Sequence, residues 1–136
     1  MTRILVPIDG SEGAMRALRH AMTGATEIHL VNVQPKADTP TLLLHMTQEN
    51  IDKAQLEHGR AMLADATRLL EAAQFAHHTH VLIGDPATQV VRVAKSEGVD
   101  AIAMGTRGMG ALGNLALGST ATKVVHLADV PVTLVK

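Results

Sequence analysis

Short apolar segments alternate with longer amphipathic segments along this chain. The apolar segments are rich in Val and Ile, which is typical of buried strands. Such alternation predicts strand–helix units that form a parallel sheet with helices on its faces. We expect an α/β fold, a single-domain Rossmann-like three-layer sandwich with a five-stranded parallel sheet in the order 3-2-1-4-5 and about four helices. The predicted strands are residues 3–8, 27–33, 78–83, 99–103 and 132–135.

Capping residues mark the starts of two predicted helices. Ser11 precedes a helix over residues 12–22, and its hydroxyl can accept a hydrogen bond from a free backbone amide of the first turn. Asp85 followed by Pro86 begins a second helix, which we expect to end near residue 95. Another helix is predicted over residues 119–127.

A longer helix is predicted at about residues 47–73. Its apolar residues recur at alternating spacings of three and four, so they form one stripe that can cover a sheet face. The stripe consists of Leu56, Gly59, Leu63, Ala66, Leu70 and Ala73. Residues 34–45 contain two prolines, and we predict that they form a long connection after the second strand.

The length and charge of the chain limit its possible functions. Its 136 residues fit one domain, residues 1–136. Because 12 basic and 13 acidic residues nearly cancel, no general field attracts nucleic acid or an anionic membrane surface, and we expect neither as a partner. No apolar run approaches the roughly 20 residues of a membrane span, and the sequence opens on a strand rather than on a secretory signal. We therefore expect a cytoplasmic protein.

The residue types that are absent narrow the chemistry further. The chain contains no Cys, which excludes disulfides and thiolate chemistry. Phe75 is the single aromatic residue among Phe, Trp and Tyr, so a bound base would lie between aliphatic side chains and backbone. This composition disfavours the stacking surfaces of single-strand nucleic-acid binders.

Glycines and hydroxyl residues form the motif with the clearest chemistry. Gly105 and Gly108 follow the fourth strand, and after nine further residues Gly118 and Ser119 begin a helix. Glycines allow positive backbone angles and close approach of a ligand to backbone amides, and a helix N-terminus offers free N–H groups. Alternatively, the glycines only form a turn and Ser119 only caps the helix. The joint spacing favours a polyphosphate site, to which Thr120 adds a hydroxyl.

Two better-known phosphate motifs do not fit this region. Residues 108–113 match the GxGxxG pattern of dinucleotide-binding folds, but the acidic candidate Asp129 lies before the final strand rather than at the end of the next one. A Walker P-loop requires Lys and Ser or Thr after Gly113, where this chain has Asn114 and Leu115.

Across its whole length the chain resembles the universal stress protein family. Nucleotide-binding members of that family carry Gly, two residues, Gly, nine residues, Gly and then Ser or Thr, a pattern that residues 105–119 match without a gap. Further resemblance lies in Pro7-Ile8-Asp9, in residues 31–33, in residues 84–86 and in residues 130–135. The resemblance implies that Pro7, Ile8, Asp9 and Val33 hold adenosine, with Met104 beside the glycine loop. The predicted nucleotide-binding set is Pro7, Ile8, Asp9, Val33, Met104, Gly105, Gly108, Gly118, Ser119 and Thr120.

Two side chains near this set have alternative roles. Asp9 can accept hydrogen bonds from ribose hydroxyls or cap the following helix. Arg107 can contact the terminal phosphates or face water.

The resemblance implies an ATP-binding regulatory protein of stressed cells. The ligand would be ATP, or ADP or AMP, with Mg or Mn as a possible bridge between phosphates. It also implies a homodimer through the closing edge strand and a further protein partner of unknown identity. Alternatives are a slow ATPase or adenylyl-transferring enzyme, and a dimeric scaffold with a vestigial pocket. No catalytic residue is predicted.

His77, His78 and His80 form a cluster that invites a metal interpretation. His78 and His80 would point to the same face of a strand. Two imidazoles make a weak site, and in sequence no carboxylate follows until Asp85. We therefore predict no metal site there.

Overall fold

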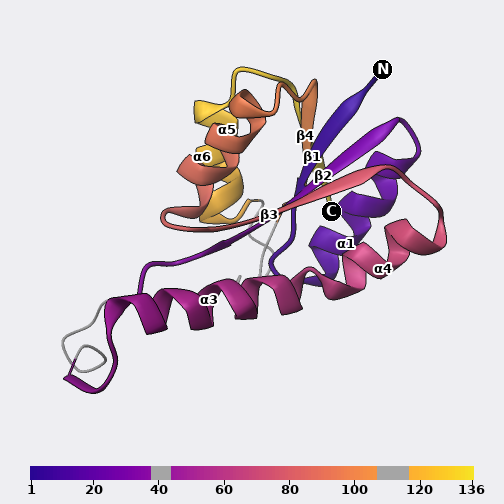
Figure 1. The fold of residues 1–136 in the computed structure, drawn as a ribbon. Helices are drawn as coiled ribbons and strands as arrows, with labels where there is room; N and C mark the ends of the chain where they lie inside the picture. The colour runs from indigo at the N-terminus through magenta and orange to yellow at the C-terminus, as the bar shows by residue number, and fades with distance from the viewer. Residues whose placement is uncertain (38–43, 107–116) are drawn as a thin grey trace.

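The computed structural model describes residues 1–37, 44–106 and 117–136, which form a five-stranded parallel sheet (Figure 1). The strands lie in the order β3-β2-β1-β4-β5, and every neighbouring pair is parallel. The predicted fold class and strand order are confirmed. The strands are β1 (Arg3–Pro7), β2 (Glu27–Gln34), β3 (His77–Ile83), β4 (Ala101–Gly105) and β5 (Val132–Val135).

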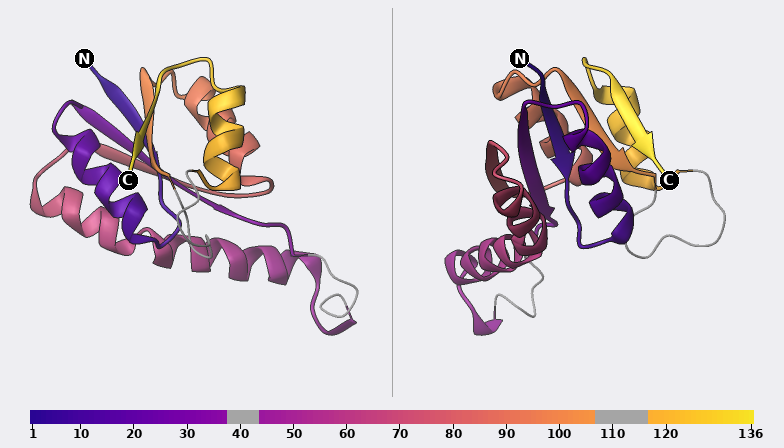
Figure 2. Two further views of the ribbon diagram at one scale, coloured as in Figure 1. Left: turned by 180° about the vertical axis from the view of Figure 1, so that it is seen from behind. Right: turned by 90° about the vertical axis from the view of Figure 1, so that its right-hand side faces the viewer.

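Helices cover both faces of the sheet and complete three layers. Helices α1 and α4 lie on one face, and α5 and α6 lie on the other (Figures 1 and 2). Helix α3 precedes α4 and begins well away from the strands (Figure 1). The helix bounds are α1 (Glu12–Met22), α3 (Gln48–Met62), α4 (Ala64–Ala72), α5 (Pro86–Ser96) and α6 (Ser119–Leu127). No helix in the described ranges is both long and apolar enough to cross a bilayer.

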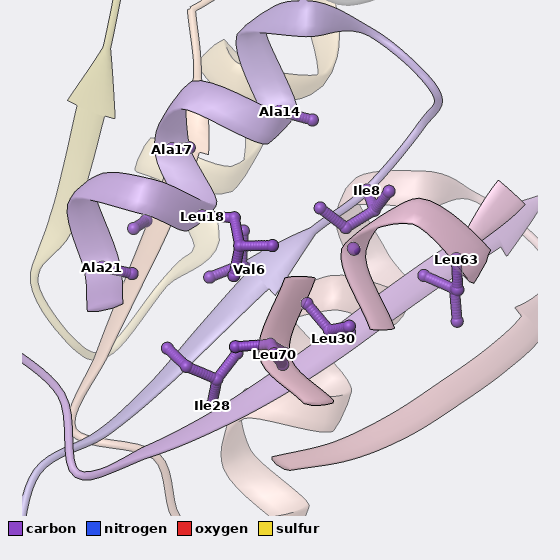
Figure 3. Close-up of a cluster of buried hydrophobic side chains, with 12 residues drawn as sticks. Val6, Ile8, Ala14, Ala17, Leu18, Ala21, Ile28, Leu30, Leu63 and Leu70 are labelled. Atoms are coloured by element: carbon purple, nitrogen blue, oxygen red, sulfur yellow. The ribbon is translucent and has the colours of Figure 1, made fainter. Parts of the chain in front are cut away.

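Each face of the sheet has its own apolar core, because successive strand residues point in opposite directions. In β1, Val6 points toward α1 and α4, whereas Leu5 points toward α5 and α6. Figure 3 shows the first core, in which Leu18 of α1 and Leu70 lie against the strands. The second core joins Leu5 to the buried faces of α5 and α6, which contribute Ala87, Val90, Val93, Ala94, Ala121 and Val124.

Side-chain caps begin three of the helices. Ser11 Oγ accepts a hydrogen bond from Ala14 N–H at 3.1 Å, and Asp85 accepts one from Thr88 N–H at 3.0 Å. Both caps confirm the sequence prediction. Thr47 caps α3 in the same way. These bonds satisfy backbone amides that would otherwise lack an intrahelical partner.

The single long helix predicted at residues 47–73 is wrong, because the helix breaks at Leu63. The Leu63 N–H bonds to the carbonyls of both Gly59 and Arg60 at 3.2 Å, which tightens the turn toward i→i+3 geometry. The apolar stripe nevertheless continues across the break, since Gly59, Leu63, Ala66 and Leu70 are all buried. Spacings of three and four fit both arrangements, so the stripe alone did not reveal the break.

The fourth strand begins two residues later than predicted and extends to Gly105. Gly98 adopts a positive φ of 62° at the end of α5, where glycine is favoured. The Val99 N–H then bonds to the Ala94 carbonyl at 3.1 Å. Val99 therefore closes the helix and packs in the core rather than starting the strand.

Candidate functional site

A cavity of about 590 Å³ opens at the carboxyl ends of the central strands. It lies where strand order reverses between β1 and β4, the position at which open α/β sheets bind ligands. Its volume is typical of small-molecule sites. The lining residues are Pro7, Ile8, Asp9, Ser11, Ala14, Val31, Val33, Pro35, Pro86, Val90, Met104, Gly105, Thr106, Gly118, Ser119, Thr120 and Ala121.

The structure brings most of the predicted nucleotide-binding set together around this cavity. Gly108 lies outside the described residues, and so does Arg107. The role of the set in binding stays a prediction. The predicted residues that line the cavity are Pro7, Ile8, Asp9, Val33, Met104, Gly105, Gly118, Ser119 and Thr120.

One side of the cavity is aliphatic. Ile8, Val31 and Met104 are each at most 5% exposed, so strand packing fixes their positions. Val33 is partly buried beside them, and Pro35 follows at the end of β2. Rigid apolar walls of this kind can hold a flat apolar group by contact on its faces.

The N-terminus of α6 forms the polar side of the cavity. Gly118 is the N-cap residue, and no side chain caps this helix, in contrast to α1, α3 and α5. The first-turn residues Ser119, Thr120 and Ala121 line the cavity. Uncapped first-turn amides, together with the positive end of the helix dipole, favour an anion at this position.

Gly118 is held to the sheet by its backbone. Its N–H donates a hydrogen bond of 2.6 Å to the carbonyl of Thr106, the residue after β4. Its φ of −72° and ψ of 165° are extended and open to any L-residue. Positive φ therefore does not explain the glycine at this position.

Gly105 is explained by close packing rather than by a positive φ. A Cβ atom at this position would lie 2.9 Å from the carbonyl carbon of Gly13 in α1. The described glycines with positive φ are Gly10, Gly84 and Gly98. Of the two properties of glycine named from the sequence, Gly105 and Gly118 thus do not use the positive backbone angle.

Asp9 lies on the exposed loop between β1 and α1. Its Oδ1 accepts a hydrogen bond from Ser11 N–H at 3.0 Å, so the carboxylate shapes the turn, while Ser11 caps the helix. A carboxylate has about four acceptor positions, and one such bond leaves capacity for ligand hydroxyls.

Asp85 links α5 to α6. Both helices border the cavity, and Pro86, the first residue of α5, lines it. Lys123 Nζ of α6 donates to Asp85 Oδ2 at 2.8 Å, and the Thr88 hydroxyl donates at 2.6 Å. The hydrogen bond from Lys123, followed by those from Thr88, lowers the pKa of Asp85 from 3.8 to about 2. The carboxylate is therefore charged at neutral pH and connects the N-terminus of α5 to α6.

Several lining residues were not predicted from the sequence. Thr106 lies inside the glycine motif and Ala121 follows Thr120, so motif position could have indicated both. The remaining unpredicted residues line the cavity because their helices pack beside it or because they lie on a neighbouring strand. The glycine motif gives no information about either. These residues are Ser11, Ala14, Val31, Pro35, Pro86 and Val90.

The histidine cluster lies away from this cavity, toward the amino ends of β2 and β3. His78 and His80 share a face, as predicted, because both contact His29 on β2. Two carboxylates that are distant in sequence, Glu27 and Glu97, reach the same group. Burial lowers the pKa of His80, Glu97 raises it, and His29 and His78 lower it further.

The sheet order, the three layers and the cavity at the switch point define a Rossmann-like α/β protein. The family model described as "Universal stress protein family" matches residues 1–136. The chain therefore belongs to the universal stress protein family.

Individual relatives agree with this assignment. Universal stress protein MJ0531 of Methanocaldococcus jannaschii is 33% identical over 141 residues, covering 98% of this chain and 81% of the relative. Among solved structures, protein MJ0577 superposes with a TM-score of 0.87 at 28% identity, covering 99% of this chain and 95% of that one. A family protein from Arabidopsis thaliana with AMP bound shares the fold, with a TM-score of 0.69, 18% identity and coverage of 100% and 92%.

Proposed function

We propose that this chain is a nucleotide-dependent regulatory protein that binds ATP or another adenine nucleotide in the cavity at the switch point. The observation that carries the proposal is the uncapped N-terminus of α6, which opens onto a cavity whose opposite wall is aliphatic. A nucleotide has matching halves, an apolar base and an anionic phosphate chain. The AMP-bound Arabidopsis protein gives an example of such a ligand on this fold.

The nucleoside would lie against the strand ends. Val31 and Val33 offer aliphatic contact to the base, and Val33, the less buried of the two, also offers backbone groups to its polar edge. Asp9 lies at the mouth of the same cavity, where its carboxylate can accept hydrogen bonds from ribose hydroxyls. A base held without aromatic stacking is consistent with the composition of this chain.

The phosphates would lie at the start of α6. Backbone amides of the first turn and the hydroxyls of Ser119 and Thr120 supply donors, and the helix dipole adds partial positive charge. A bound Mg or Mn ion would reduce the charge of the polyphosphate and needs only one or two protein oxygens. Apart from the Asp9 carboxylate, the residues that line the cavity are aliphatic, glycine or hydroxyl in character, which supports binding as the primary function.

We also propose that the chain forms a homodimer through β5. This strand ends the sheet beside β4 and presents its other side as an edge. Its residues are partly buried except Thr133, which is exposed. Unpaired backbone groups on an edge strand favour pairing with a second copy.

Methyl-resolved NMR with ATP tests the location of binding. Addition of ATP should shift the methyl signals of Ile8, Val33 and Met104 at the cavity. The methyl signals of Leu70, which is buried in α4 and does not line the cavity, serve as the internal control and should stay in place. Shifts that concentrate on α4 and leave the cavity methyls unchanged would contradict the proposed site.

A further inference from the structure

A second group of ligand-type side chains lies at the other end of the strands. Glu27 and His29 of β2 and His78 of β3 each offer one atom, and these atoms all lie within 4.8 Å of one another. Their approach follows from the sheet: residues two apart in a strand share a face, and His29 is the register partner of His78. We call these three residues the Glu27–His29–His78 cluster.

One hydrogen bond and one close nitrogen–oxygen contact already orient the cluster. Glu27 Oε1 lies 2.9 Å from His29 Nε2 and 3.1 Å from His78 Nε2. One carboxylate oxygen therefore faces both imidazole nitrogens. The His29 and His78 rings stack with centroids 4.8 Å apart, which limits their rotation.

Neighbouring groups fix the two less exposed members of the cluster. His29 is 3% exposed, and its second nitrogen, Nδ1, lies 3.1 Å from Nε2 of His80. The other oxygen of Glu27 lies 3.9 Å from Arg3 Nε on the adjacent strand. Outer contacts of this kind set the tautomer of a ligating histidine and the orientation of a ligating carboxylate.

We propose that the Glu27–His29–His78 cluster binds a divalent transition-metal ion, with Zn²⁺ as the best fit. Two imidazoles and one carboxylate are a ligand set that zinc accepts, and a water molecule completes the tetrahedron. Zinc–ligand distances of about 2.0–2.2 Å place neighbouring ligand atoms about 3.4 Å apart. The two distances from Glu27 Oε1 to the imidazole nitrogens, 2.9 and 3.1 Å, need to open by only a few tenths of an ångström. The two imidazole nitrogens lie within 4.8 Å of each other, so a modest rotation of the exposed His78 ring completes the set.

Binding exchanges protons for the ion without any redox step. Each Nε2 must offer its lone pair to the ion, so a proton carried on that nitrogen moves to Nδ1 or leaves to solvent. His29 in this state carries its proton on Nδ1 and donates it to His80 Nε2. The 3.1 Å contact between these two rings already has the required geometry.

A neighbouring set, His29, His80 and Glu97, is also close enough for an ion. It shares His29 with the first cluster, and Glu97 is exposed at the end of α5. The Glu27 side chain is 19% exposed and is contacted by Arg3, so it is the better-oriented carboxylate. We therefore assign the ion to Glu27 and give His80 the role of a positioning residue that acts through His29.

Calorimetric titration of untagged protein with Zn²⁺ at neutral pH, against a competing chelator, tests the proposal. We expect one ion per chain. Glu27→Gln and His78→Gln should each lower the association constant at least about 100-fold, and His80→Leu about tenfold, because losing an outer contact costs less than losing a ligand. His78 is largely exposed, so its variant should fold normally, which circular dichroism would verify.

Two controls separate this site from general binding by surface histidines. His77→Gln changes a neighbour in sequence that pairs with Ile28 and so points to the other face, and His58→Gln changes an exposed helical histidine. Neither should change zinc affinity. Co²⁺ in place of Zn²⁺ should give the visible absorption of a tetrahedral site in the parent and in both controls, and lose it in His78→Gln.

Several results would overturn the proposal. One is that the folded parent takes up no zinc at micromolar free ion. Another is that His77→Gln lowers the zinc affinity as much as His78→Gln does. Full affinity in Glu27→Gln together with loss in Glu97→Gln would assign the ion to the neighbouring set instead. The site is independent of the nucleotide cavity, so Gly118→Val should retain zinc binding even if that variant loses ATP.

Discussion

A Cβ atom on Gly105 would lie 2.9 Å from the carbonyl carbon of Gly13 and 3.1 Å from its oxygen. The end of β4 therefore packs directly against the backbone of α1, with no room for a side chain. Because both elements also line the cavity, this contact sets the distance between the first loop and the glycine motif.

Replacing Gly105 with Ala should lower the free energy of unfolding by about 1–3 kcal/mol, since the obstructing atoms are backbone atoms that cannot rotate away. Urea unfolding followed by circular dichroism measures this change. Gly24→Ala is the matched control, because a Cβ at that position meets nothing within 4 Å. Equal stability of the two variants would show that the close packing is not real.

Asp85 gives a prediction about pH. Its pKa is lowered from 3.8 to about 2 in the folded state, so the charged carboxylate stabilises the fold above pH 3.8, and this contribution disappears as the pH falls through about 2. Asp85→Asn keeps a capping oxygen but removes the charge. The variant should melt at a lower temperature than the parent at neutral pH, and the gap should close between pH 3.8 and about 2.

The partner of that charge provides the control for the pH experiment. In a Lys123→Gln background the Asp85→Asn substitution should change the melting temperature less, because the main cause of the pKa shift is gone. A gap that is independent of pH would mean that the charge of Asp85 contributes nothing to stability.

The proposed dimer predicts a difference between the two edge strands. Thr133→Asp should raise the dimer dissociation constant at least about tenfold, because like charges would face each other where two copies of β5 pair. Thr79→Asp places the same charge on an exposed residue of β3, the opposite edge, and should leave the dimer intact. Sedimentation equilibrium measures the dissociation constants of both variants. If only Thr79→Asp dissociates the dimer, the interface lies at β3 instead of β5.

The sequence was sufficient for the architecture because the relevant signals are local. The caps at Ser11 and Asp85 and the apolar runs of the strands each depend on a few neighbouring residues. The errors occurred where a residue serves a tertiary purpose. Val99 looks like the start of a strand but closes α5, and Leu63 continues an apolar stripe although the helix tightens and breaks there.

The cavity was predictable in part for the same reason. The carboxyl ends of parallel strands share one edge of the sheet, so the loops after the first, second and fourth strands could be grouped without a structure. The family resemblance then indicated Asp9 and Val33 at this edge. The need for glycine at position 105 was not predictable, because the backbone that would clash with a side chain there belongs to a helix some ninety residues earlier in the chain. The Glu27–His29–His78 cluster was missed likewise, since its members meet only through the register of β2 with β3.

The central claim is that adenine nucleotide binds with its phosphates at the start of α6. Gly118 tolerates a side chain conformationally, because its φ of −72° and ψ of 165° suit any residue. Gly118→Val should therefore fold normally while its side chain obstructs the approach of phosphate to the first-turn amides. Ser119→Ala removes one hydroxyl, leaves these amides in place and should weaken binding less.

Calorimetric titration with ATP of the parent and the Gly118→Val variant is the most direct measurement. We predict saturable binding to the parent and an affinity at least about 100-fold lower for the variant, because two or more charge-assisted hydrogen bonds are lost. Unchanged affinity in the folded variant, or a parent that ignores ATP at millimolar concentration, would contradict the account.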